Sequence, residues 1–233
     1  RELLPGEVVV VRDREISTHR LAPAPTAKRC AFEHVYFARP DSIVFGDAVG
    51  EVRRRLGAQL AREAPAAADV VVPVPDSGLF AALGYSSESG LPFELGMKRN
   101  HYVGRTVIEP KQAIRNFGVK VKLNPVRSII AGKSVVLIDD SIVRGTTSRE
   151  IVQMARDAGA RKVYFASASP PVRFQNVYGI DMPNQNELVA TGRSEAEIAR
   201  EIGADLLVYQ DLAALKTAVR SAGSRLAEFE ASC

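Results

Sequence analysis

Cysteine is nearly absent from this sequence, and tryptophan is missing altogether. The two cysteines, Cys30 and Cys233, lie at opposite ends of the 233 residues. This spacing excludes a disulfide-rich scaffold and a zinc site built on cysteine pairs. No run of about 18 apolar residues is present that could cross a membrane. We therefore expect a cytoplasmic protein in a reducing compartment, with no membrane partner.

A large net charge of either sign is also lacking. Lysine and arginine number 31 against 27 aspartates and glutamates, a net charge of +4, and 46% of the residues are hydrophobic. This composition excludes disordered and collagen-like chains and indicates a globular protein. The positive excess is too weak to predict a nucleic-acid partner without a clustered basic face. An anionic small molecule would suit it as well.

Apolar runs of strand length alternate with helical segments along most of the chain. The runs cover residues 69–75, 134–138, 162–168 and 205–209, and the helical segments follow residue 78 and cover about 147–158 and 195–202. Strands that are apolar on both faces and alternate with helices are typical of a parallel sheet covered on both sides. The sequence therefore predicts an α/β fold with a mainly parallel sheet.

Three other segments add to this organisation. The run Gly6–Val11 predicts an opening strand with nothing before it to pair with, and the prolines and alanines of Ser17–Arg29 predict a linker. An amphipathic helix is predicted over 47–63, with the arginines at 53–55 on its solvent face. Basic residues are scattered without firm periodicity over 98–122, as is typical of a functional lid or a solvated surface loop.

The segment 135–148 carries the clearest chemical signal. Four apolar residues end in Asp139 and Asp140, and a short polar loop then enters a helix. Ligands of open parallel sheets bind beyond the carboxyl ends of the strands. Gly145 permits a tight turn, and the N–H groups of residues 143–148 with the helix N-terminus can converge on a phosphate. Thr147 and Glu150 also fit a capping box, which would explain part of the hydroxyl content without a ligand.

Two adjacent carboxylates repel each other and need a partner. A divalent metal or the hydroxyls of a ligand would supply one. Alternatively, Asp140 caps a turn while Asp139 pairs with an arginine. The loop Asp76-Ser77-Gly78, between an apolar strand and a helix, also has two interpretations. It could bind a ligand, or Ser77 could simply cap the helix.

The segment 135–147 resembles the phosphoribosyl pyrophosphate (PRPP) signature of type I phosphoribosyltransferases. Four further blocks, 30–42, 74–78, 102–106 and 177–183, resemble one subfamily, the glutamine phosphoribosylpyrophosphate amidotransferases, and the match covers residues 28 to about 230. The resemblance implies a type I phosphoribosyltransferase domain over 28–233, with a flexible loop over the site. Residues 1–27 resemble the last strands of an otherwise missing glutaminase domain plus a linker, so we do not expect this chain alone to hydrolyse glutamine. It is either a fragment of a longer enzyme, which we favour, or a synthase fed by free ammonia or by another subunit.

The resemblance also implies an activity. Ammonia, derived from glutamine in the complete enzyme, displaces pyrophosphate from C1 of PRPP to form 5-phosphoribosylamine in the first committed step of purine biosynthesis. Two alternatives are a regulatory protein that binds PRPP without turnover and a salvage phosphoribosyltransferase acting on a free base. A regulator would usually carry an added DNA-binding module, and no helix-turn-helix pattern is visible.

Site residues follow from the same resemblance. The acidic pair would hold the ribose hydroxyls, the loop after it the 5′-phosphate, and the loop at 76–78 the pyrophosphate. The substrate-binding residues would be Asp76, Ser77, Gly78, Asp139, Asp140, Ser141, Val143, Arg144, Gly145, Thr146, Thr147 and Ser148. A catalytic role would fall to Asp139, Asp140, Arg99 and Arg105, and Mg²⁺ would lie nearest Ser77, Asp139 and Asp140.

The basic segment 98–122 would close over the substrate. Relatives have Lys-Asn-Arg-Tyr where this chain has Arg99-Asn100-His101-Tyr102, so we expect closure to be weaker or dependent on pH, and a His101→Arg variant to remove that dependence. No iron–sulfur cluster is expected, because Cys30 occupies the first ligand position but Asn176 the second. The resemblance further implies a homo-oligomer that purine nucleotides inhibit.

Overall fold

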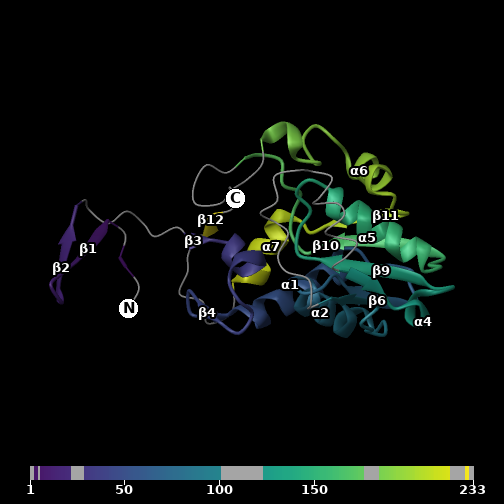
Figure 1. The fold of residues 1–233 in the computed structure, drawn as a ribbon, viewed down its shortest axis with the longest axis horizontal. Coiled ribbons are helices and arrows are strands. Elements are labelled where there is room, and N and C mark those ends of the chain that lie inside the picture. Colours follow the sequence, from purple (N-terminus) through teal and green to yellow (C-terminus); the bar gives the residue numbers. More distant parts are fainter. Residues whose placement is uncertain are drawn as a thin grey trace.

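A parallel sheet forms the centre of the protein. The computed structural model describes residues 3–4, 6–21, 29–100, 123–175, 184–220 and 229–230. Within these ranges the central sheet has four strands in the order β11-β10-β9-β6 (Figure 1). They are β6 (Val70–Pro73), β9 (Ser134–Asp139), β10 (Lys162–Ser167) and β11 (Leu206–Tyr209). All three strand pairings are parallel, which confirms the predicted α/β class.

Helices cover both faces of this sheet. Val135 and Leu137 of β9 pack in one cluster with α5 (Thr146–Asp157) and α6 (Glu195–Ile202). Their neighbours Val136 and Ile138 pack in a second cluster on the other side. That side is covered by α1 (Val49–Glu63), α2 (Leu79–Ser89) and α7 (Leu212–Val219). Because alternate residues of a strand face opposite sides, both sets of apolar side chains are buried.

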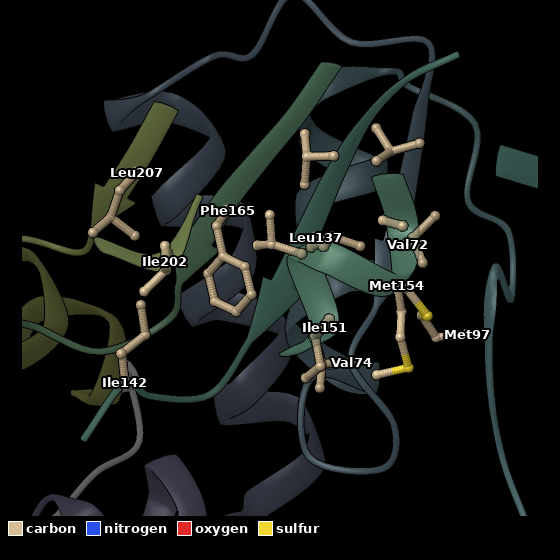
Figure 2. Close-up of a cluster of buried hydrophobic side chains, with 14 of the residues drawn as sticks. Val72, Val74, Met97, Leu137, Ile142, Ile151, Met154, Phe165, Ile202 and Leu207 are labelled. Atoms are coloured by element: carbon tan, nitrogen blue, oxygen red, sulfur yellow. The ribbon is translucent and has the colours of Figure 1, made fainter. Parts of the chain in front are cut away.

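Phe165 lies in the middle of the first cluster. It belongs to β10, and its side chain is wholly buried. Figure 2 shows its ring between Leu137 of the neighbouring strand and Ile202 of α6. The ring therefore fills the space between the sheet and the helices that cover it.

The remaining elements are mostly short. They are β1 (Glu7–Arg12), β2 (Glu15–Arg20), β3 (Arg29–Cys30), η1 (Glu33–Phe37), β4 (Ile43–Val44), β5 (Asp47–Ala48), β7 (Met97–Arg99), β8 (Leu123–Pro125), α4 (Arg127–Ile130), η2 (Gln185–Glu187) and β12 (Phe229–Glu230). The antiparallel pair β7–β8 flanks residues 101–122, so most of the predicted lid lies outside the described residues. None of the helices described is both long and apolar enough to span a membrane.

The opening strand has a partner, contrary to the sequence-based expectation. β1 pairs antiparallel with β2 across a turn at Asp13 and Arg14. The partner follows β1 in the chain, and it includes Ser17–Arg20, which were predicted to begin a linker. A polar strand of this kind, exposed along its whole length, has no periodic apolar signal in its sequence.

The prediction for the arginines of α1 is also wrong in part. Arg54 is exposed and Arg55 half-buried, but Arg53 is only 5% exposed. Its guanidinium donates hydrogen bonds to the carbonyl oxygens of His34 (2.8 Å) and Ala38 (2.7 Å). Arg53 thus ties the π-helical turn η1 to α1, and its buried donors are satisfied by these carbonyls.

We predict that Phe165→Ala lowers the free energy of unfolding by about 3–5 kcal/mol, because it removes a fully buried ring and leaves a cavity. Phe165→Leu keeps most of the volume and should cost less than about 1.5 kcal/mol. Urea denaturation of the three proteins measures both values. Equal losses in the two variants would contradict this account of the core.

Candidate functional site

The loops that follow β6, β9 and β10 leave the sheet at one edge. The backbone N–H of Val74 donates to the carbonyl oxygen of Ile138 at 2.8 Å, and the backbone N–H of Ala168 donates to the backbone carbonyl oxygen of Asp139 at 2.9 Å. The strands therefore stay paired up to their last residues. This brings residues 74–78 and the acidic pair together, as the parallel sheet predicts.

The loop at 76–78 packs directly on the end of β9. A Cβ atom on Gly78 would lie 2.1 Å from the carbonyl oxygen of Ile138, so only glycine fits. The Ser77 hydroxyl donates to Oδ1 of Asp139 at 3.1 Å. Gly78, without a side-chain cap, occupies the N-cap of α2, so the alternative in which Ser77 caps that helix is wrong. The peptide bond between Pro75 and Asp76 is cis.

Asp139 and Asp140 are both buried, with 7% of each residue exposed. Oδ1 of Asp139 also accepts the backbone N–H of Asp140 at 2.9 Å, and Oδ2 of Asp140 accepts the Ser141 hydroxyl at 2.9 Å. Burial raises the pKa of Asp139 well above its ordinary value, and the neighbouring charge of Asp140 raises this pKa further. The structure thus brings two acidic side chains together in a buried place, where an added positive charge or a hydroxyl donor would stabilise them.

None of the ion pairs among the described residues joins Asp139 to an arginine, so the alternative in which this residue pairs with an arginine has no support in the part of the chain that the structure describes. The charge of Asp140 instead acts on Arg53 of α1: burial lowers the pKa of this guanidinium, and Asp140 raises it. Sequence analysis missed Arg53 as a neighbour of the site. The available signal was its spacing, because it lies four residues after Val49 and three before Leu56, on the apolar face.

The predicted phosphate loop enters α5 through Gly145. This residue has φ +74° and forms the N-cap, with no side chain capping the helix. The capping box predicted for Thr147 and Glu150 is therefore wrong, since Thr147 already lies in the first helical turn. No side chain among the described residues caps α5, so its first N–H groups can bind an anion. Thr147 is exposed near them, whereas Ser148 is buried.

Of the two lid arginines predicted to be catalytic, Arg99 is the one that the structure describes. It ends β7 and forms an ion pair with Asp76 of the neighbouring loop. Their side chains are 35% and 61% exposed, so both can be reached from solvent. Arg105 and His101 lie outside the described residues.

The donor set around the acidic pair suits magnesium. Among the described residues no group of three or more histidine, cysteine, aspartate or glutamate side chains could enclose a metal ion. Magnesium ordinarily binds one or two carboxylates and completes its shell with water and substrate phosphates. The oxygens of Ser77, Asp139 and Asp140 fit that pattern.

A cavity of about 860 Å³ lies next to the carboxyl ends of β10 and β11. It is lined by Phe32 and Val35 near η1, by residues 169–175 after β10, and by residues 208–212 and Leu215. Neither the acidic pair nor the loop at 141–148 contributes to it. We therefore place the candidate site around the acidic pair and not in this cavity.

Known proteins resemble the chain in both fold and sequence. A glutamine PRPP amidotransferase from B. subtilis, solved in complex with ADP and GMP, matches 98% of this chain and 50% of its own with a TM-score of 0.84 and 44% identity. A second structure, described as the allosteric regulatory enzyme of purine biosynthesis, matches with a TM-score of 0.82 and 45% identity, covering 94% of this chain and 47% of its own. Together with the parallel sheet and its flanking helices, these likenesses define the fold as that of a type I phosphoribosyltransferase.

Sequence relatives narrow the class. Amidophosphoribosyltransferases from Glycine max (chloroplastic), Archaeoglobus fulgidus and Rhizobium etli are 51%, 48% and 53% identical to this chain. The alignments cover 93%, 97% and 94% of this chain but only 38%, 49% and 45% of these relatives. No protein-family model matches. The chain is thus homologous to the amidophosphoribosyltransferases and spans half their length or less.

We predict that Asp139→Asn raises the melting temperature of the protein by at least about 2 °C at pH 7.5, without metal or ligand. The pKa of Asp139 is higher in the folded than in the unfolded protein, so its carboxyl destabilises the fold once pH exceeds the unfolded value. The gain should therefore shrink as pH falls toward about 4. Thermal unfolding between pH 4 and 8 measures it.

Asp205→Asn provides a control of opposite sign. Burial alone would raise the pKa of Asp205, but the backbone N–H of Val163 and the charge of Arg156 hold this pKa below its ordinary value. Its carboxylate stabilises the fold above the unfolded pKa and loses that effect as pH falls through the folded one. Asp205→Asn should therefore lower the melting temperature at pH 7.5. A wild-type protein more stable than Asp139→Asn at this pH would contradict the first prediction.

Proposed function

We propose that this chain is the phosphoribosyltransferase part of an amidophosphoribosyltransferase. Residues 28–233 would form this domain, and residues 1–27 the end of a preceding glutaminase domain with its linker. The reaction joins ammonia to C1 of PRPP and releases pyrophosphate, giving 5-phosphoribosylamine for purine synthesis. The observation that carries the proposal is the hydrogen bond from Ser77 to Asp139, which joins the acidic pair to the loop at 76–78.

We assign the ribose, the 5′-phosphate and the pyrophosphate of PRPP to separate groups of residues at the carboxyl edge of the sheet. Asp139 and Asp140 are acceptors for the two ribose hydroxyls, since a carboxylate accepts hydrogen bonds from a vicinal diol well. The N–H groups of residues 143–148 and the hydroxyls of Thr146, Thr147 and Ser148 would surround the 5′-phosphate. Gly78 lets the loop at 76–78 approach the backbone closely, and Arg99 would meet the pyrophosphate there.

The bond changes need no protein base. The lone pair of neutral ammonia attacks C1 while the bond from C1 to the pyrophosphate oxygen breaks, and that oxygen keeps the electron pair. The new C1–NH₃⁺ group loses one proton to water. Because C1 becomes cationic as the bond breaks, the site must stabilise the leaving oxygen and exclude water. Arg99 and Arg105 would stabilise the leaving oxygen.

Magnesium would be held by Ser77, Asp139 and Asp140 and would offset the charge of the pyrophosphate. The chain has only two cysteines, so a cluster on four thiolates is not part of the proposal. Inhibition by purine nucleotides is proposed from the resemblance, and the ADP and GMP bound by the B. subtilis enzyme agree with it. A cytoplasmic location and a homo-oligomer are proposed on the same basis.

Pyrophosphate release by the purified chain tests the proposed function. The assay contains PRPP and Mg²⁺, with ammonium at pH 8 in one arm and glutamine in the other. Release that requires ammonium and ignores glutamine supports a synthase without its glutaminase. PRPP binding without release in either arm would favour a regulatory protein, and no binding would overturn the proposal.

We predict that Asp140→Asn weakens PRPP binding at least about 10-fold, because it removes a charge-assisted acceptor for a ribose hydroxyl. Isothermal calorimetry with PRPP and Mg²⁺ measures the effect. Glu201→Ala is the matched control: Glu201 pairs with Arg149 on the surface, away from the acidic pair, and its loss should leave PRPP affinity unchanged. Equal affinities of wild type and Asp140→Asn would show that the acidic pair is assigned wrongly.

A further inference from the structure

Residues 187–189, at the end of η2 and directly after it, contact the predicted phosphate loop. The backbone N–H of Val189 donates to the carbonyl oxygen of Val143 at 2.9 Å. The side chain of Val143 packs with Leu188, and a Cβ on Gly145 would lie 3.0 Å from the Val189 side chain. Residues 187–189 therefore set the path of the loop where it turns into α5.

Arg144 is the only charged residue within the loop at 141–148. Its Nε donates to Oε2 of Glu187 at 2.9 Å, and the two side chains are 39% and 48% exposed. Within the described part of the chain, this is the one hydrogen bond of the Arg144 side chain. The guanidinium is thus held at Nε, while both terminal nitrogens keep their donors for a ligand.

The contact between Arg144 Nε and Glu187 affects how the other edge of the guanidinium can bind an anion. An arginine held at one edge by a carboxylate loses less rotational freedom when its other edge binds a phosphate, because its orientation is already restricted. The Glu187 charge also offsets part of the attraction between Arg144 and a dianion. Being half exposed, the pair is weak by itself, so its effect should be on orientation more than on stability.

We propose that Glu187 is a positioning residue for the 5′-phosphate: it holds Arg144 so that the two terminal nitrogens of the guanidinium reach the phosphate of a 5-phosphorylated ribose. This inference rests on the proposed function, because it takes the loop at 141–148 as the phosphate site. Sequence analysis did not single out Glu187, which lies 43 residues after Arg144. The structure brings the two together through the contacts of residues 187–189 with the loop.

Calorimetry with two separate probes tests the proposal in this chain. Ribose 5-phosphate carries the phosphate and hydroxyls of the substrate, whereas inorganic pyrophosphate represents its other end. Glu187→Ala should raise the Kd for ribose 5-phosphate about 3- to 10-fold and leave the Kd for pyrophosphate unchanged. Glu187→Gln keeps an oxygen acceptor for Nε and should stay within about twofold of the wild type.

A double-mutant cycle tests whether Glu187 affects phosphate binding through Arg144. Arg144→Ala should weaken ribose 5-phosphate about 10-fold, and adding Glu187→Ala to it should have no further effect. Glu201→Ala, in the Arg149–Glu201 pair on the nearby helices, controls for the loss of an exposed ion pair. Equal losses from Glu187→Ala in the presence and absence of Arg144 would overturn the inference, as would parallel losses for both probes.

The outcomes separate the inference from the proposed function. If the wild type binds PRPP and ribose 5-phosphate, and Glu187→Ala leaves both unchanged, the role of Glu187 is wrong while the proposed function stands. If the wild type binds neither, both are overturned. Melting temperatures of all variants within about 2 °C of the wild type would show that the binding changes do not come from unfolding.

Discussion

The pairing of β9 with a parallel strand on each side is the constraint on which the rest of the structure depends. All six residues of β9 are buried, and its neighbours β6 and β10 cover its two edges. No charged side chain can therefore be placed along the strand before its carboxyl end, where Asp139 begins the polar loop. The same pairing carries β6 to that end, which is why residues 76–78 lie against the acidic pair.

Burial of the acidic pair comes from this arrangement. Asp139 is surrounded by backbone and by the Ser77 hydroxyl, so its charge has little contact with water. The nearby buried cation, Arg53, already donates hydrogen bonds to the carbonyl oxygens of His34 and Ala38. Within the described residues, the negative charge of the site is thus compensated only in part, an arrangement often found where a ligand completes the charge balance.

Much of the fold could be predicted from the sequence, because it depends on local periodicity. The four strands of the central sheet follow from runs without a polar face, and α6 has the predicted bounds of 195 and 202. The acidic pair and Gly145 were also identified, since their chemistry is local. Their assignment as PRPP ligands came from the resemblance and stays a prediction.

The remaining features depend on contacts between distant segments. Arg53 was assigned to the solvent face by its charge, although its position is apolar, and only the carbonyl oxygens of η1 make its burial possible. The capping box at Thr147 failed because Gly145 begins the helix with a left-handed turn two residues earlier. The ion pair of Arg144 with Glu187 has no sequence pattern at all, because it spans 43 positions.

The acidic pair would also link the lifetime of the protein to the supply of a ligand that binds there. A compound that relieves the repulsion between Asp139 and Asp140 binds the folded chain and not the unfolded one, so it shifts the folding equilibrium by mass action. Under starvation for that compound, a larger fraction of molecules would be unfolded at any moment and open to proteases. The abundance of the protein would then follow the concentration of the molecule it binds, without any dedicated regulator.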